Sequence, residues 1–307
     1  MREGVEKLLP NANILVARGC GNLITDTDTS GFAEAIEVAK QADTVVICIG
    51  EPMNYSGEGN CRTDIRLPGV QAELVKEIIA VNSNSAVLLF NGRPLDLTNI
   101  YDAPAILDMW FPGSEGGSAA ANLLFGISNP CGRLAMSFPK SVGQCPIYYN
   151  RTSTGRPKSA PENEHQPFAS GYLDCGNLPL FFFGEGLSYT DFTYESMTLD
   201  KKELTEQDSI KVTVKLKNSG DRVGKEVVQL YLRDKFSSAV RPVQELIAFE
   251  KVELDAGECR EITFNITEPM LRYWNASNEF VSEPGAFSVS VGYADHMALT
   301  EEFTLIK

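Results

Sequence analysis

The chain has 307 residues, a length typical of about two domains. Its 41 acidic residues outnumber its 27 basic ones, and the net charge of -14 argues against a nucleic-acid or anionic-membrane partner, whose phosphates would be repelled. Hydrophobic residues make up 43% of the chain, enough for sizeable cores, and no run of about 18 apolar residues predicts a membrane-spanning helix.

The first half of the chain alternates short apolar runs with segments of helical periodicity. Strands are predicted at 12–18, 44–50, 85–91 and 105–110, and helices at 31–42, from Pro68 to Ile79 and at 116–125. This alternation predicts parallel βαβ units, and so an α/β fold. Ligands of open parallel sheets gather beyond the carboxyl ends of the strands, which include Gly50-Glu51 and Asn91-Gly-Arg-Pro94.

The second half of the chain has a different pattern. Residues 139–188 are rich in Pro, Gly, Ser and Asn, which predicts a long connecting region. From about residue 190 apolar residues recur with a period of two. The clearest alternating segments are 210–217, 227–232, 261–266 and 287–292. About seven short strands separated by turn signals predict an antiparallel β-sandwich.

The cysteines and histidines do not form a recognisable metal site. The 7 cysteines occur singly and the chain has only 2 histidines, so neither a structural zinc site nor a disulfide framework is expected. A single disulfide is an alternative that the sequence leaves open. Cys48 lies in an apolar run and is expected to be a small buried residue. His165 and His296 are expected to be structural or exposed. The first residues lack the apolar stretch of a signal peptide. The compartment is unknown.

The loop 50–65 holds the strongest candidate for chemistry. Glu58 lies between Gly57 and Gly59, whose permissive backbone would let the side chain swing over a pocket. A carboxyl group partly removed from water has a raised pKa and can serve as a general acid at neutral pH. The alternative is that Glu58 belongs to an acidic surface loop.

Other residues near the strand ends have simpler interpretations. Arg62 and Asp64 are expected to pair with each other or with backbone groups, and Arg93 is a candidate anchor for the loop. Tyr55 and Trp110 would form a stacking platform if they lay together, although single aromatic residues usually belong to a core.

A series of motifs runs along the chain from residue 1 to residue 307. The loop contributes Gly50-Glu51, Glu58 and Arg62-Thr-Asp-Ile65. The later motifs are Asn91-Gly-Arg-Pro-Leu95, Trp110-Phe-Pro-Gly-Ser-Glu-Gly-Gly117, Gly132-Arg-Leu-Ala-Met-Ser-Phe-Pro139, Pro146-Ile-Tyr-Tyr149, Phe183-Gly-Glu-Gly-Leu-Ser-Tyr189 and Arg241-Pro-Val-Gln-Glu-Leu246. In this order they resemble glycoside hydrolase family 3, the β-glucosidase and β-xylosidase family, much more specifically than any single motif does.

The resemblance implies a domain plan and an activity. The implied domains are an α/β sandwich at 1–140, an ordered connecting region at 141–189 and a fibronectin type III-like domain at 190–307. In the family a preceding TIM-like barrel carries a nucleophilic Asp, and retaining hydrolysis of terminal β-glucosyl bonds also needs an acid/base carboxyl group. By motif match Glu58 takes the acid/base position, and Tyr55 and Arg62 are candidate substrate-binding residues. The implied substrate is a neutral oligosaccharide or glucoside, with no cofactor and no metal.

The sequence departs from the family pattern in three respects. The barrel is absent, and with it the nucleophile. The first strand of the sandwich domain is missing too, because Arg2–Leu9 resembles the helix that precedes Cys20, so the neighbouring strand is expected to have an unpaired edge. Cys61 and Glu185 stand where Ser and an aromatic residue or His are expected.

The missing barrel leaves the function of the chain open between two classes. As part of a longer or split enzyme, the chain is expected to be inactive alone and to act with a barrel polypeptide or as a homo-oligomer. As a non-catalytic remnant or interaction module, it would bind carbohydrate or protein. Phosphorolysis is a third interpretation, although its acid/base system would lie in the missing barrel. The parent enzyme would be compatible with a periplasmic or secreted location.

Overall fold

The computed structural model describes residues 1–158, 164 and 166–307, and it divides into two compact units. His165 lies outside the described residues. The α/β unit comprises Met1–Ser128, Phe138–Pro146 and Leu178–Leu180, and the β unit comprises Asn129–Ser137, Ile147–Asn177 and Phe181–Lys307. The domain boundaries expected at residues 140 and 190 stay predictions.

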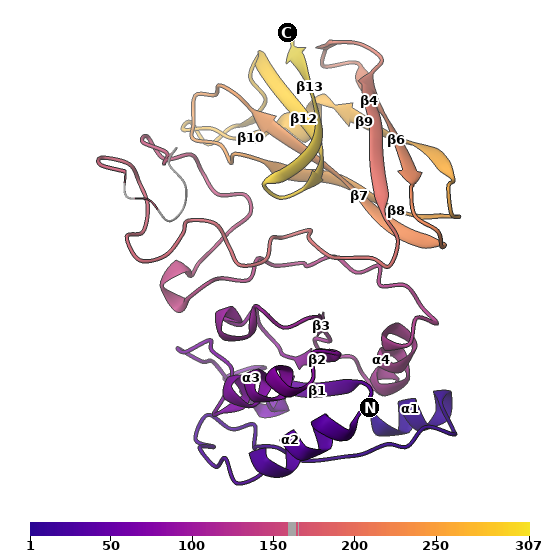
Figure 1. Cartoon of the computed structure of the whole chain (residues 1–307). Helices are drawn as coiled ribbons and strands as arrows, with labels where there is room; N and C mark the ends of the chain where they lie inside the picture. Colours follow the sequence, from indigo (N-terminus) through magenta and orange to yellow (C-terminus); the bar gives the residue numbers. More distant parts are fainter. Residues whose placement is uncertain (159–163, 165) are drawn as a thin grey trace. The chain divides into compact units, whose positions relative to one another are not determined.

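The α/β unit is built on a parallel sheet of three strands (Figure 1). Its order is β1 (Val45–Gly50), β2 (Ser85–Phe90), β3 (Ile106–Asp108), in agreement with three of the predicted strands. The central strand β2 has hydrogen-bonded neighbours on both sides, and Val87, Leu88 and Leu89 are fully buried. The continuous apolar run of this strand is therefore explained by burial on both faces.

Four α-helices accompany the sheet within the described part of this unit. They are α1 (Arg2–Leu8), α2 (Phe32–Gln41), α3 (Gln71–Val81) and α4 (Gly116–Leu124). Helix α3 begins at Gln71, one turn after the predicted start at Pro68, and it buries Leu74 and Ile78 at helical spacing. The approach of α1 to α4 needs a glycine, because a Cβ atom on Gly4 would lie 2.2 Å from the carbonyl oxygen of Gly117.

Two predictions for this unit are wrong, and both concern the environment of β1. The segment 12–18 forms no strand and pairs with nothing in the sheet, although it is apolar, and its Val16 is 62% exposed. Among the described strands β1 pairs only with β2, which confirms the expected unpaired edge. Cys48 is exposed because side chains alternate along a strand, and the buried Ile47 and Ile49 occupy the opposite face.

The β unit consists mainly of antiparallel strands, as predicted for a sandwich. One sheet has the order β5-β13-β12-β7-β8, a second has the order β4-β6-β9, and β10 and β11 form a separate pair. The strands are β4 (Phe192–Leu199), β5 (Glu203–Leu204), β6 (Ser209–Asn218), β7 (Gly224–Asp234), β8 (Glu245–Leu254), β9 (Cys259–Thr267), β10 (Tyr273–Trp274), β11 (Phe280–Val281), β12 (Gly285–Tyr293) and β13 (His296–Leu305). Only β5 and β13 run parallel among these pairs. The β unit therefore has the predicted all-β architecture.

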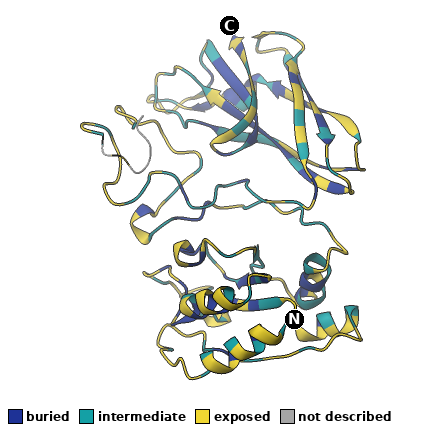
Figure 2. Ribbon diagram, in the orientation of Figure 1, coloured by how far each residue is buried: buried dark blue, intermediate teal, exposed yellow. Residues whose placement is uncertain are grey.

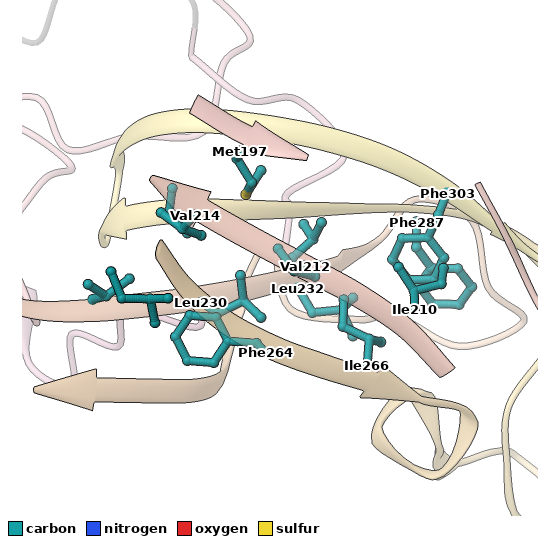
Figure 3. Packing of buried hydrophobic residues seen from close by; sticks show 14 of the residues in the cluster. Met197, Ile210, Val212, Val214, Leu230, Leu232, Phe264, Ile266, Phe287 and Phe303 are labelled. Atoms are coloured by element: carbon teal, nitrogen blue, oxygen red, sulfur yellow. The ribbon is translucent and has the colours of Figure 1, made fainter. Parts of the chain in front are cut away.

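The core of the β unit is formed by the inward faces of its sheets (Figure 3). Along β6, Ile210, Val212 and Val214 are fully buried, while Lys211 between them is exposed. The rings of Phe287 and Phe303 stack within the same cluster, with centroids 5.4 Å apart. Figure 2 shows the resulting alternation of buried and exposed positions along the strands. This is the period of two that the sequence displays.

Short 3-10 helices complete the described secondary structure. They span Met53–Tyr55, Thr98–Ile100, Val142–Gln144 and Glu268–Leu271. Within the described ranges, no helix combines the length and the hydropathy needed to cross a membrane.

Candidate active site

Strand β1 ends at a glycine whose conformation directs the chain into loop 51–66. Gly50 has a φ of +137°, and a Cβ atom there would lie 1.8 Å from the carbonyl oxygen of Phe90 on the neighbouring strand. The buried side chain of Gln71 accepts a hydrogen bond from Gly50 N at 2.7 Å and donates to Gly50 O at 2.9 Å. Glu51 N then donates to Phe90 O at 2.8 Å. The start of loop 51–66 is therefore fixed to the end of the sheet.

A buried carboxylate, Glu51, lies between two arginines at this point. Its Oε1 is 2.7 Å from Arg62 Nη1 and its Oε2 is 3.3 Å from Arg93 Nε. The exposed fractions of the three side chains are 1% for Glu51, 9% for Arg62 and 19% for Arg93. Charges this well shielded from water need their partners, because loss of one leaves the other buried and unpaired.

The two arginines hold loop 51–66 at separate places. Arg93 donates through Nη2 to Tyr55 O and to Ser56 Oγ, the latter at 3.1 Å, so it anchors the loop as predicted. Arg62 donates through Nη2 to Arg66 O at 2.9 Å, a backbone group. One buried carboxylate is thus connected to both sides of the loop.

Glu58 lies at the tip of this loop. Its neighbours Gly57 and Gly59 have φ values of +119° and +77°, and a Cβ atom on either would meet nothing within 4 Å. Glu58 is exposed, and no hydrogen bond or ion pair holds its side chain among the residues that the structure describes. The carboxylate is therefore free to meet a group brought to the loop from outside.

Arg62 and Asp64 do not pair with each other, but each binds a backbone group, which is the other alternative that the sequence left open: Arg62 donates to Arg66 O, and Asp64 Oδ1 accepts from Arg66 N at 3.0 Å. Arg62 turns inward to Glu51, whereas Asp64 pairs with Arg66 at 2.6 Å on the surface. Hydrogen bonds from Arg66 lower the pKa of Asp64 to about 2. Arg62 is consequently committed to the base of the loop in this structure.

Tyr55 also has a packing role. Its hydroxyl accepts a hydrogen bond from Ile24 N at 3.0 Å, and the guanidinium carbon of Arg62 lies 5.7 Å from the ring centroid. Trp110 packs instead against Phe138, with ring centroids 5.9 Å apart. These contacts favour the interpretation of both aromatic residues as packing residues. Whether Tyr55 or Arg62 also touches substrate stays a prediction.

Two further polar residues lie at the strand ends: Asn91, in a segment where ligands are expected to gather, and Asp108, which was not predicted. Asn91 follows β2; its Nδ2 donates to Arg93 O at 2.9 Å, and its buried Oδ1 has no hydrogen-bond partner within the described part of the chain. Asp108 ends β3; its Oδ1 accepts from Trp110 N at 3.2 Å, and its Oδ2 likewise has no partner there. Burial raises the pKa of Asp108 to about 6. Their position directly after buried strands was the available sequence signal.

The α/β unit contains two hollows beside the loop. One of about 400 Å³ is lined by charges of both signs, among them Arg62, Arg66 and Asp96. The other, of about 230 Å³, is lined by Cys20, Cys48 and Glu51, among others. Across residues 1–158, 164 and 166–307, no three or more His, Cys, Asp or Glu side chains lie in a group that could hold a metal ion.

Comparison with known proteins identifies both parts of the chain. Residues 1–189 match the model of the glycosyl hydrolase family 3 C-terminal domain, and residues 226–294 match that of a fibronectin type III-like domain. A periplasmic β-glucosidase of Salmonella typhimurium is 42% identical over 260 residues, which cover 84% of this chain. A β-xylosidase of Formosa agariphila is 38% identical over 288 residues, which cover 94% of it.

A solved structure supports the same relationship. The β-glucosidase from Listeria innocua in complex with isofagomine superposes with a TM-score of 0.91 at 37% identity, over 99% of this chain and 42% of that one. The chain likewise spans only 34% of the Salmonella relative and 38% of the Formosa relative. The fold of both units agrees with these matches, and the chain belongs to glycoside hydrolase family 3, whose C-terminal domain and fibronectin type III-like domain it contains.

Proposed function

We propose that this chain supplies Glu58 as the acid/base residue of a retaining β-glucosidase whose nucleophile lies on a barrel outside the chain. The observation that carries the proposal is the contrast within loop 51–66. The base of the loop is held by buried charges, whereas Glu58 is exposed and unpaired at the tip, among the described residues. A single carboxyl group presented in this way suits an active site that two parts of a protein complete together.

The proposed reaction has two steps with Glu58 in alternating roles. In the first, the barrel's carboxylate attacks the anomeric carbon, the glycosidic bond breaks, and Glu58 gives its proton to the departing oxygen. In the second, the ionised Glu58 takes a proton from water, whose oxygen attacks the anomeric carbon and releases the barrel's carboxylate. Two displacements at the same carbon retain the β configuration.

The exposure of Glu58 in this chain is consistent with that cycle. A general acid at neutral pH needs a raised pKa, and removal of water from a carboxyl group raises it. Closure of a barrel and substrate over the loop tip would remove that water. The acid function would therefore appear only in the assembled enzyme, and we expect the chain alone to be inactive.

The substrate class follows from the relatives rather than from this site. β-Glucosidases and β-xylosidases both occur among them, and a neutral glucoside is compatible with the acidic chain. The second candidate function is a non-catalytic module that binds carbohydrate or protein.

A complementation experiment separates the two functions. The chain is combined with a family 3 barrel polypeptide, and turnover of an aryl β-glucoside is measured together with the size of the complex. Restored turnover that falls about 10²–10⁴-fold in Glu58→Gln supports the acid/base role. Asp64→Asn is the matched control, because it removes an exposed carboxylate from the same loop. Restored turnover that Glu58→Gln leaves unchanged would contradict the role.

A further inference from the structure

We propose that Glu51 is a positioning residue for the acid/base carboxylate, acting through Arg93 on the loop that carries Glu58; the inference rests on the proposed function of Glu58. No contact joins Glu51 to the loop tip directly. Glu51 acts on the tip through the fixed position of its carboxylate, through the groups that its arginine partners hold, and through the short stretch of chain between those groups and Glu58.

Glu51 is fixed to the sheet independently of its charge. Its N–H donates to Phe90 O, and the preceding Gly50 is held on both its N–H and its C=O by Gln71, which is 2% exposed. These backbone contacts do not involve the Glu51 side chain. A change of the Glu51 carboxylate should therefore leave the ends of β1 and β2 in place.

The carboxylate uses both oxygens to orient two guanidinium groups. Oε1 binds Arg62 at 2.7 Å and Oε2 binds Arg93 at 3.3 Å, with the carboxylate only 1% exposed. Two positive groups held close together in a shielded site repel each other unless the carboxylate neutralises part of their charge. Loss of the negative charge should displace the guanidinium groups outward, toward water.

Displacement of Arg93 would release the middle of the loop. Arg93 Nη2 donates to Tyr55 O and to Ser56 Oγ, and Ser56 is two residues before Glu58. Two residues of extended chain span at most about 7 Å, so the position of Ser56 limits the reach of Glu58. Beyond Ser56 the tip forms a turn in which Asn60 N donates to Gly57 O at 3.2 Å, and this bond joins the tip to itself rather than to the sheet. Arg93 is therefore the last side-chain anchor before the acid/base residue on this side of the loop.

The consequence for the first step of the reaction should depend on the leaving group. A misplaced acid slows reactions whose leaving group needs a proton, whereas a dinitrophenolate leaves without one. A misplacement of about 1 Å can cost about 10²-fold in rate. We expect Glu51→Gln to lower kcat/KM about 10²-fold for an alkyl β-glucoside and less than about 10-fold for a dinitrophenyl β-glucoside. The ratio kcat/KM reports the first step alone, whereas kcat also contains the second step, in which Glu58 is the base for both substrates.

The first test uses the chain itself and hydrogen–deuterium exchange. In Glu51→Gln we expect amide exchange at Tyr55 and Ser56 to accelerate at least about 10-fold, while β1 and β2 keep their protection. Asp64→Asn, which changes the charge of the same loop equally, should leave these rates unchanged. Arg93→Lys keeps the positive charge but loses the planar guanidinium group with its several N–H donors. It should accelerate amide exchange at Tyr55 and Ser56 less than Glu51→Gln does, and it replaces Glu51→Gln in the test if that variant does not fold.

The second test measures the two glucosides with the chain and a barrel polypeptide. Equal losses for both leaving groups in Glu51→Gln, unchanged exchange at Tyr55 and Ser56, or the same effects in Asp64→Asn would each overturn the positioning role. If Glu58→Gln slows the alkyl glucoside and Glu51→Gln does not, only this inference is wrong. If Glu58→Gln itself has no effect, the proposed function is wrong as well.

Discussion

The hydrogen bonds between Gln71 and Gly50 give a stability prediction that can be worked from the structure. Gln71 is 2% exposed, and it binds Gly50 N at 2.7 Å, Gly50 O at 2.9 Å and Pro68 O at 3.1 Å. Gln71→Leu keeps a similar volume but leaves the N–H and C=O of Gly50 without this partner. Each buried unsatisfied group costs about 1–3 kcal/mol, and the apolar leucine offsets part of that cost, so we expect a loss of about 2–4 kcal/mol.

The loss can be assigned to the α/β unit by tryptophan fluorescence. The chain has 2 tryptophans, Trp110 in the α/β unit and Trp274 in the β unit. In a Trp274→Phe background, urea unfolding followed by fluorescence reports on the surroundings of Trp110. Gln41→Leu, at the exposed end of α2, is the control and should change the unfolding free energy by less than about 0.5 kcal/mol. A loss of less than about 0.5 kcal/mol in Gln71→Leu as well would refute the reasoning.

Two further predictions concern groups outside the loop. Burial raises the pKa of Asp108 to about 6, above its unfolded value near 4. The contribution of this carboxyl group to the free energy of unfolding is therefore present below about pH 4 and is lost as the pH rises through 6. Asp108→Asn should flatten the pH dependence of the unfolding free energy in this range, and an unchanged dependence from about pH 4 to 7 would contradict the assignment. Leu230→Ala in the fully buried core of the β unit should cost about 2–5 kcal/mol in urea unfolding followed by Trp274 fluorescence, and a cost under about 1 kcal/mol would contradict the packing described here.

The sequence predicted most of the secondary structure because burial leaves a local pattern. The run at β2 is apolar because this central strand of the parallel sheet is shielded on both faces, and β6 alternates because one face of its sheet meets the core. The segment 12–18 has a similar apolar composition, yet Val16 is exposed and no strand pairs with it. Composition describes a residue's preference, and pairing depends on a partner elsewhere in the chain.

The candidate site could be predicted only where its residues carry a local sequence signal. Glu58 stood out because two glycines flank it and because the surrounding motifs resemble those of the family. The partner of Arg62 could not be predicted, because Glu51 lies 11 residues earlier and the meeting depends on how Gly50 turns the chain. Cys48 was expected to be buried, since an apolar run does not reveal that one face of an edge strand is uncovered.

The most direct test of the acid/base role is rescue by azide. The chain carrying Glu58→Ala is combined with a barrel polypeptide and given a dinitrophenyl β-glucoside, whose leaving group departs without a proton. Azide can attack the glycosyl-enzyme without a general base, so the account predicts faster turnover with azide and formation of β-glucosyl azide. Turnover of Glu58→Ala equal to that of the unchanged chain, with no glucosyl azide formed, would contradict the account.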